Sequence, residues 1–159
     1  MPRRPQIAVV GTSRPKDGAD DLALEVGRRL ADAGAVVVCG GLTGVMEAVA
    51  RGAREAGGES IGIVPGNDIA AANEHCTHVV ATGIGHARNL AVVSSGEVVI
   101  AIGGEWGTLS EIGFARAIGR TVVALRSWTL SGEGPMESAP GIVPATTPDE
   151  AVRAALAAI

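Results

Sequence analysis

The chain has 159 residues, of which 23 are glycine and only three are aromatic, and its formal net charge is −4. This length suits one domain with its own core and is short for two. An apolar fraction of 47% excludes a disordered chain. The scarcity of aromatic rings argues against a base-stacking surface for single-stranded nucleic acid, and the acidic balance disfavours a nucleic-acid partner.

Neither a membrane segment nor a disulfide framework is expected. No apolar run approaches the ~18 residues of a membrane span, and the run after Arg3 and Arg4 is too short for a signal peptide. Two cysteines at this length make no disulfide framework, and Cys39 ends an apolar run, where a buried free thiol is expected. The sequence therefore predicts a cytoplasmic protein with no membrane partner.

Short apolar runs alternate with helical patterns along the chain. Strands are predicted at residues 7–10, 36–39, 61–64, 79–80, 98–102 and 122–125. Apolar residues recur at helical spacing between these runs, as Leu22, Val26 and Leu30 do after the first. Uninterrupted β-branched runs between amphipathic helices are typical of parallel strands that are buried on both faces. The chain is therefore predicted to be a single-domain α/β protein, with a Rossmann-like parallel sheet flanked by helices.

The C-terminal part of the chain is predicted to end in a helix. Residues 131–146 are rich in Gly, Pro, Ser and Thr and predict a surface loop. A helix over 147–159 follows, with Thr147 as its N-cap, Pro148 at its first position and Glu150 completing a capping box.

Glycine recurs at the predicted strand ends. Glycine-containing segments follow the first, second and fifth strands, at residues 11–13, 40–44 and 103–108. Glycine lets a backbone approach an anion closely, and the helix that follows offers free N–H groups. Turns of α/β proteins use glycine in any case, but three such loops on one sheet edge favour a phosphate site for a nucleotide-like ligand. The candidate ligand-binding residues are Gly11, Ser13, Gly40, Gly41, Thr43, Gly44, Met46, Gly103, Gly104, Trp106, Gly107 and Thr108.

Three common sites of α/β proteins are absent from the sequence. There is no GxxxxGK(S/T) phosphate loop, no GxGxxG after the first strand and no GxSxG nucleophile elbow. The polar stretch 74–78 contains His75, Cys76 and His78, but its spacing matches no zinc pattern, so a polar loop is expected rather than a metal site.

The loop after the fifth strand carries the strongest chemical signal. The sequence GTLSE at 107–111 puts a glycine, a hydroxyl and a carboxylate within about one helical turn. Arg88 stands near the start of an upstream helix, and its guanidinium can bind phosphate or pair with Glu111. Trp106 stands in the same loop and can lie over a base or cover the loop.

These stretches resemble the LONELY GUY (LOG) family of the SLOG superfamily over nearly the whole chain. The resemblance rests on GGLTGVMEAVARGA at 40–53, ATGIGHARN at 81–89 and IAIGGEWGTLSEI at 100–112. It is closest to the bacterial branch that includes molybdenum-cofactor carrier proteins. LOG enzymes release the free base and ribose 5-phosphate from nucleoside 5′-monophosphates, with a PGGxGTxxE motif and an upstream arginine. The resemblance implies that Arg88 and Glu111 are catalytic, Glu111 stabilising an oxocarbenium-like sugar, and that the protein is a homodimer or larger homo-oligomer.

The motif also departs from the family pattern. Gly103 stands in place of the motif proline and Glu105 in place of its second glycine, which puts a carboxylate beside the proposed phosphate site. Two functions therefore remain open: a phosphoribohydrolase that requires no cofactor, and a non-catalytic carrier or sensor of molybdenum cofactor or a nucleotide. A DNA-processing role, which related Rossmann folds also serve, is disfavoured by the net charge.

Overall fold

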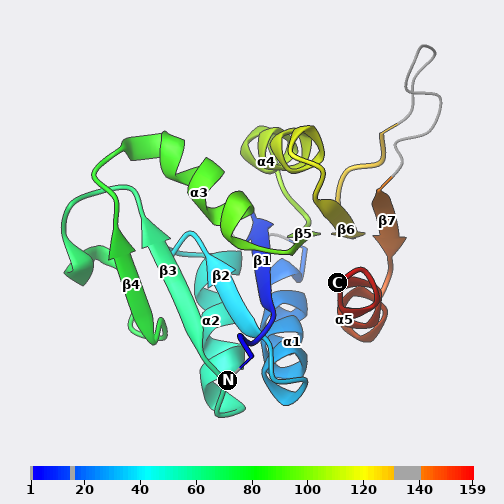
Figure 1. Cartoon of the computed structure of the whole chain (residues 1–159), viewed down its shortest axis with the longest axis horizontal. Helices are drawn as coiled ribbons and strands as arrows, with labels where there is room; N and C mark the ends of the chain where they lie inside the picture. Colours follow the sequence, from blue (N-terminus) through cyan, green and yellow to red (C-terminus); the bar gives the residue numbers. More distant parts are fainter. Residues whose placement is uncertain (1, 15–16, 131–140) are drawn as a thin grey trace.

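The computed structural model describes residues 2–14, 17–130 and 141–159 (Figure 1). Within these residues, seven parallel strands form one sheet in the order β4-β3-β2-β1-β5-β6-β7. The strands are β1 (Gln6–Gly11), β2 (Val36–Cys39), β3 (Ser60–Val64), β4 (His78–Ala81), β5 (Val98–Ile102), β6 (Thr121–Leu125) and β7 (Ile142–Ala145). The helices are α1 (Ala19–Asp32), α2 (Val45–Glu55), α3 (Arg88–Ser95), α4 (Trp106–Ala117) and α5 (Pro148–Ala157), with short 3-10 turns η1 (Ile69–Ala71) and η2 (Gly85–Ala87). The predicted Rossmann-like α/β class is confirmed.

Helices cover both faces of the sheet. Along β5, side chains alternate between two apolar clusters: Ile100 packs in the cluster with α1, α2 and α5, and Val99 packs in the cluster with α3 and α4. Figure 1 shows these two groups of helices on opposite sides of the strands. The central strands are therefore buried on both faces, which is why their sequences are β-branched runs without polar alternation.

Helices α1 and α2 cross at unusually close range. A Cβ atom added at Gly27 of α1 would lie 2.1 Å from the carbonyl oxygen of Val49, and one added at Gly52 of α2 would lie 2.0 Å from that of Leu24. Each glycine therefore lets its helix touch the backbone of the other helix directly. This contact holds α1 and α2 together on the face of the sheet opposite α3 and α4.

The strand order reverses next to β1. The chain runs outward from β1 to β4, returns through α3 to β5 on the other side of β1, and then runs outward again to β7. As a result, α1 leaves the carboxyl end of β1 on one face of the sheet while α4 leaves that of β5 on the other. A crevice at the carboxyl ends of such strands is where open α/β sheets bind ligands.

The prediction of a loop over 131–146 is wrong for its last part. Ile142–Ala145 forms β7, which pairs with β6 so that Pro144 lies opposite Ala124. A proline is tolerated there because β7 is an edge strand, where one side of the backbone needs no ladder partner. Residues 131–140 of the predicted loop lie outside the described residues.

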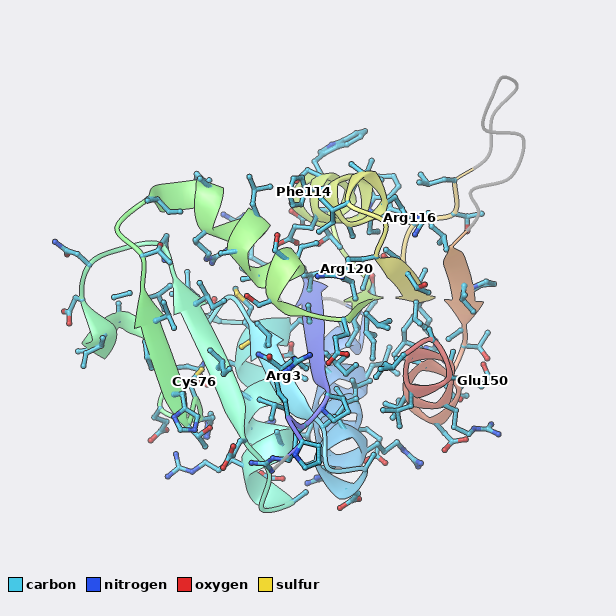
Figure 2. The ribbon with its side chains drawn as sticks, viewed as in Figure 1. Arg3, Cys76, Phe114, Arg116, Arg120 and Glu150 are labelled. Atoms are coloured by element: carbon cyan, nitrogen blue, oxygen red, sulfur yellow. The ribbon has the colours of Figure 1, made fainter. Side chains whose placement is uncertain are left out.

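The predicted start of the terminal helix is confirmed, and α5 ends at Ala157. The Thr147 hydroxyl accepts a hydrogen bond from the Glu150 amide at 3.2 Å. The Glu150 carboxylate reaches back one residue further than a standard capping box, accepting from the Thr146 amide and hydroxyl, both at 2.9 Å. These hydrogen bonds lower the pKa of Glu150, which Figure 2 labels on α5. Among the described residues, no helix has the length and hydropathy needed to cross a membrane.

Candidate functional site

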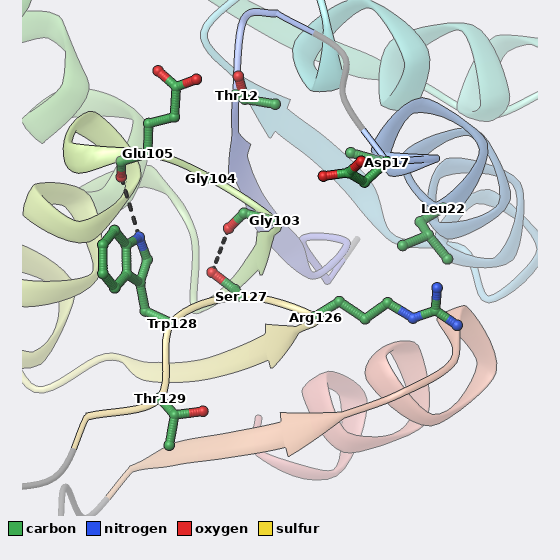
Figure 3. A pocket seen from close by; sticks show the side chains of 11 residues that line it. Thr12, Asp17, Leu22, Gly103, Gly104, Glu105, Arg126, Ser127, Trp128 and Thr129 are labelled. Carbon is green, nitrogen blue, oxygen red and sulfur yellow. Dashed lines mark hydrogen bonds between the residues drawn. The ribbon is translucent and has the colours of Figure 1, made fainter.

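Two cavities lie at the carboxyl edge where the strand order reverses. The wide cavity, about 570 Å³, is bounded by the ends of β1, β5 and β6 and by the start of α1 (Figure 3). The narrow cavity, about 250 Å³, is bounded by the ends of β1 and β2 and by the starts of α3 and α4. Thr12 and Glu105 line both cavities, so the two are neighbours along one edge.

The structure brings together most of the residues that the sequence singled out. The narrow cavity is lined by the predicted residues Gly11, Ser13, Gly40, Met46, Arg88, Gly107, Thr108 and Glu111. Gly103 and Gly104 line the wide cavity. Gly41, Thr43, Gly44 and Trp106 line neither of these cavities.

Arg88 is the first residue of α3 and lies buried against the floor of the narrow cavity. Its side chain donates to Asn89 Oδ1 and lies 3.9 Å from Met46 Sδ, while its Nε is buried with no hydrogen-bond partner among the described residues. Burial lowers the pKa of Arg88, and the neighbouring Glu111 opposes that shift. A Cβ atom at Gly40 would lie 2.9 Å from Arg88 Nη2 and 2.5 Å from Met46 Sδ, so only glycine leaves room for this guanidinium.

Glu111 lies in the second turn of α4 and faces the same cavity. Burial raises its pKa to about 7, and the positive charge of Arg88 acts in the opposite direction. The carboxyl group therefore changes its ionisation near neutral pH, which is typical of groups that exchange protons in catalysis.

The loop before α4 is held by two side chains that follow β6. Ser127 Oγ donates to the Gly103 carbonyl at 2.5 Å, and Trp128 Nε1 donates to the Glu105 carbonyl at 3.2 Å (Figure 3). Gly104 has a φ of +112°, and a Cβ atom there would lie 2.4 Å from Thr108 Cβ. Glycine is required at this position both by the backbone conformation and by the threonine above it.

The start of α4 is open to an anion. Its N-cap residue, Glu105, makes no side-chain capping hydrogen bond, and the first turn contains no acidic residue. The first amides of a helix have no partner within the helix, so this end can accept a phosphate. Glu105 itself is exposed, and in Figure 3 its carboxylate points away from Trp128 and Ser127.

Trp106 is 76% exposed at the first position of α4. Its ring packs against Trp128, with the ring centroids 5.3 Å apart and the planes tilted by 37°. Of the two indoles, Trp128 is the one that lines the wide cavity.

The glycine loop after β2 is hydrogen-bonded to Thr12 and Ser13, which line the narrow cavity. Thr43 Oγ1 donates to the Ser13 carbonyl at 3.1 Å, and the Val45 amide donates to the Thr12 carbonyl at 3.0 Å. Gly44 has a φ of +68°, and a Cβ atom there would lie 2.4 Å from the same Thr12 carbonyl. Gly41 has a φ of +74°, and a Cβ atom there would lie 2.8 Å from Val64 Cγ1.

Sequence reasoning missed the wall of the wide cavity that follows β6. This wall consists of Arg126, Ser127, Trp128 and Thr129. The segment contains no glycine, which was the signal used to find the other loops. Its position directly after a strand was the available signal, because the carboxyl ends of parallel strands meet at one edge.

The polar side chains around Cys76 contact different neighbours. His75 lies 4.0 Å from Glu47, His78 lies 4.0 Å from Glu59, and the Cys76 thiol faces Asn73 at 3.7 Å. Across the described ranges, no group of three or more His, Cys, Asp or Glu side chains is placed to hold a metal ion.

The fold and these cavities define a Rossmann-like α/β protein whose candidate site lies at the reversal of strand order. The SLOG cluster4 family model matches residues 4–152, and the chain belongs to this family. This confirms the resemblance to the SLOG superfamily that the loop motifs indicated.

Known proteins similar to this chain include both studied and uncharacterised members. An uncharacterised protein of Archaeoglobus fulgidus is 39% identical over 122 residues, which are 76% of this chain and 80% of that protein. The molybdenum cofactor binding protein of the phototrophic bacterium Rippkaea orientalis superposes with a TM-score of 0.88 at 30% identity, covering 98% of this chain and 97% of that one. The molybdenum cofactor carrier protein of Chlamydomonas reinhardtii gives a TM-score of 0.84 at 28% identity, covering 99% and 98%.

A more distant structure shares the fold alone. DNA processing protein A of Helicobacter pylori, described for its single-stranded DNA binding, gives a TM-score of 0.72 at 20% identity over 96% of this chain and 80% of that one.

Proposed function

We propose that the chain binds a phosphorylated, ring-bearing small molecule, the molybdenum cofactor or a nucleotide, across the two cavities at the start of α4. The observation that carries this proposal is the pair of cavities flanking the first turn of α4 at the strand-order reversal. Supporting it, two proteins whose names state molybdenum cofactor binding or carriage match nearly the full chain at 28–30% identity. The net charge of −4 favours such a small molecule over DNA.

The residues of the narrow cavity suit the phosphate end of such a ligand. Thr108 offers a buried hydroxyl. Gly107 offers a backbone amide, and a Cβ atom added at this residue would have no described atom of another residue within 4 Å. Arg88 offers a guanidinium whose Nε has no hydrogen-bond partner among the described residues. Backbone amides, a hydroxyl and a cation are the donor set that phosphate needs.

The wide cavity suits the ring end. Its volume of about 570 Å³ falls within the range typical of small-molecule sites. Trp128 provides a flat apolar wall, and Leu22 and Ala19 provide aliphatic surface opposite the glycine loop. A fused heterocycle is the kind of group that packs against an indole.

Calorimetric titration with a pterin monophosphate, AMP and GMP tests the proposal. Thr108→Val keeps the shape of the side chain and removes the hydroxyl, so it should weaken binding of the phosphorylated ligand by at least ~10-fold. Ser110→Ala is the matched control, because the Ser110 hydroxyl points back to the Gly107 carbonyl of its own helix, and it should change affinity less than ~2-fold. Absence of binding for all three ligands would contradict the proposal.

A second candidate function, hydrolysis of a nucleoside 5′-monophosphate, is favoured by the presence of Arg88 and Glu111 in one cavity, where each influences the pKa of the other. Ionised Glu111 beside the ribose would stabilise the positive charge that develops as the N-glycosidic bond breaks. The bond electrons would leave with the base, and one water would supply the hydroxyl that adds to C1′ and the proton that the base takes. Arg88 would favour the ionised carboxylate that this step needs, because its charge acts against the burial that raises the Glu111 pKa.

Chromatographic detection of free base after incubation with AMP, GMP and CMP tests this second function. Because the ionised form of Glu111 is required, the rate should rise with pH through about 7 in wild type and be lost in Glu111→Gln. Release of no more base by wild type than by Glu111→Gln would leave the chain a binding protein only. The homodimer or larger assembly and the cytoplasmic location stay predictions.

A further inference from the structure

The only two cysteines of the chain lie side by side, although 36 residues separate them. Cys39 is the last residue of β2 and is completely buried, and Cys76 lies partly buried in the segment before β4. In the β2–β3 ladder Cys39 pairs with Gly62, and a Cβ atom at Gly62 would lie 2.6 Å from Cys76 Sγ. The missing side chain of Gly62 therefore makes the space that seats the Cys76 thiol beside Cys39.

The two thiols are chemically unequal. The neighbouring Cys39 thiol lowers the pKa of Cys76. The neighbouring Cys76 thiol and complete burial raise the pKa of Cys39. Because the thiolate is the reactive form, Cys76 is the thiol that an oxidant meets first, and Cys39 is held behind it as the resolving thiol.

The pair is connected to the wall of the narrow cavity. Asn73 accepts from the Cys76 thiol at 3.7 Å, donates its amide to the Gly41 carbonyl at 2.8 Å and donates its side chain to the Leu42 carbonyl at 2.9 Å. Cys39 is followed directly by Gly40, which packs against the Arg88 guanidinium. A change at the thiols therefore reaches the loop of residues 40–42, of which Gly40 and Leu42 line the narrow cavity.

We propose that Cys39 and Cys76 are a redox modification site: they form a reversible intramolecular disulfide with peroxide, and this disulfide loosens the wall of the narrow cavity. The Cys76 thiolate attacks hydrogen peroxide, giving the sulfenic acid and hydroxide. The Cys39 thiol then attacks that sulfur, forming the S–S bond and releasing water. In total, two thiols lose two electrons and two protons, and one peroxide becomes two waters.

Thiol counting and peptide mapping of the full chain after mild peroxide treatment test the site. We expect wild type to lose both thiols together, as an intramolecular bridge that a dithiol reductant reverses. Cys39→Ser should stop at a sulfenic acid on Cys76 that a sulfenic-acid trap captures, and Cys76→Ser should keep its remaining thiol at the same peroxide dose. Retention of both thiols in wild type, a bridge between chains, or equal oxidation of Cys76→Ser and wild type would overturn the proposal. The wild-type mapping needs no variant to fold.

The link to the cavity is measured separately and rests on the proposed ligand. Calorimetric affinity for a pterin monophosphate should fall at least ~3-fold from the reduced to the oxidised protein, because the Asn73 contact with Cys76 is lost. The Cys39→Ser variant, which forms no bridge, is the control. An equal affinity in both states overturns the link, whereas absence of binding in the reduced protein is a failure of the proposed function.

Discussion

Two glycine-rich regions of this protein use the same residue for opposite purposes. At the crossing of α1 and α2, Gly27 and Gly52 have no room for a methyl group, because a backbone oxygen already lies within about 2 Å of the added atom. Along α4, Gly107 and Gly113 face open space. The first pair brings two helices into contact, whereas Gly107 leaves a backbone uncovered at the site. The share of glycine in the composition therefore says little until each position is examined for what surrounds it.

The charged groups of the two regions differ in their exposure to solvent. On the α1–α2 side, ion pairs such as Arg28 with Glu55 and Arg29 with Glu25 are 39–45% exposed, and such pairs contribute at most ~1 kcal/mol each. At the site, Arg88 and Glu111 are withdrawn from water and both have shifted pKa values. These ion pairs therefore stay accessible to solvent, whereas the two charged groups of the narrow cavity are costly to bury.

The largest expected effect comes from filling the close helix crossing. Gly27→Ala or Gly52→Ala forces α1 and α2 apart, since the obstacle is backbone that cannot rotate away, and should lower the free energy of unfolding by ~3 kcal/mol. Gly113→Ala, at an exposed position of α4, is the matched control and should raise the free energy of unfolding by ~0.5–1 kcal/mol. Urea unfolding measures both. A Gly27→Ala protein as stable as the control would remove the distinction between the two regions.

The next effect concerns the buried carboxyl group. Because the pKa of Glu111 rises from 4.5 to about 7 on folding, the folded protein binds more protons than the unfolded chain between these values, so wild-type stability falls as pH rises through this range. Glu111→Gln has no ionisable group here and avoids this loss. Its free energy of unfolding should exceed that of wild type by ~1–3 kcal/mol at pH 8, and the difference should shrink toward pH 4.5. Unfolding at several pH values, with Glu74→Gln as the exposed control, checks this. A difference that does not change with pH would contradict it.

A third change separates stability from binding at α4. Gly107→Ala adds a methyl group where the structure leaves open space, so folding should be unchanged or slightly favoured. The same methyl group would cover the amides proposed for phosphate, and affinity for a pterin monophosphate should fall at least ~10-fold. Gly113→Ala, further along the same helix, should leave affinity unchanged. Equal affinities of the two variants would move the phosphate away from the start of α4.

The smallest expected effect concerns the support of the glycine loop. Trp128→Phe keeps an aromatic side chain, though a smaller one, and removes the donor to the Glu105 carbonyl, which should cost ~1 kcal/mol. Trp106→Phe changes a ring that is mostly in solvent and should stay within ~0.5 kcal/mol of wild type. Calorimetric unfolding of both variants tests the comparison. If the Trp106 variant loses more stability, the loop depends on the exposed indole instead.

The sequence predicted the parts of the fold that depend on local pattern. Six strands were predicted at positions where the structure has them, because β-branched runs and glycine stops are local signals. β7 was missed because Pro144 and the surrounding Gly, Pro and Thr residues match a loop, and only the pairing with β6 makes this segment a strand. The part of the candidate site that the glycine loops form was predicted from the sequence. The wall after β6 and the meeting of Cys39 with Cys76 depend on tertiary packing, and neither leaves a local pattern.

The packing of Trp106 against Trp128 has a practical optical consequence. These are the only tryptophans of the chain; Trp106 begins α4 and Trp128 lies in the segment after β6. Intrinsic fluorescence therefore reports on one edge of the sheet and is blind to the α1–α2 crossing. A denaturation curve followed by fluorescence will coincide with one followed by far-ultraviolet circular dichroism only if this edge and the helix crossing unfold as a single cooperative unit.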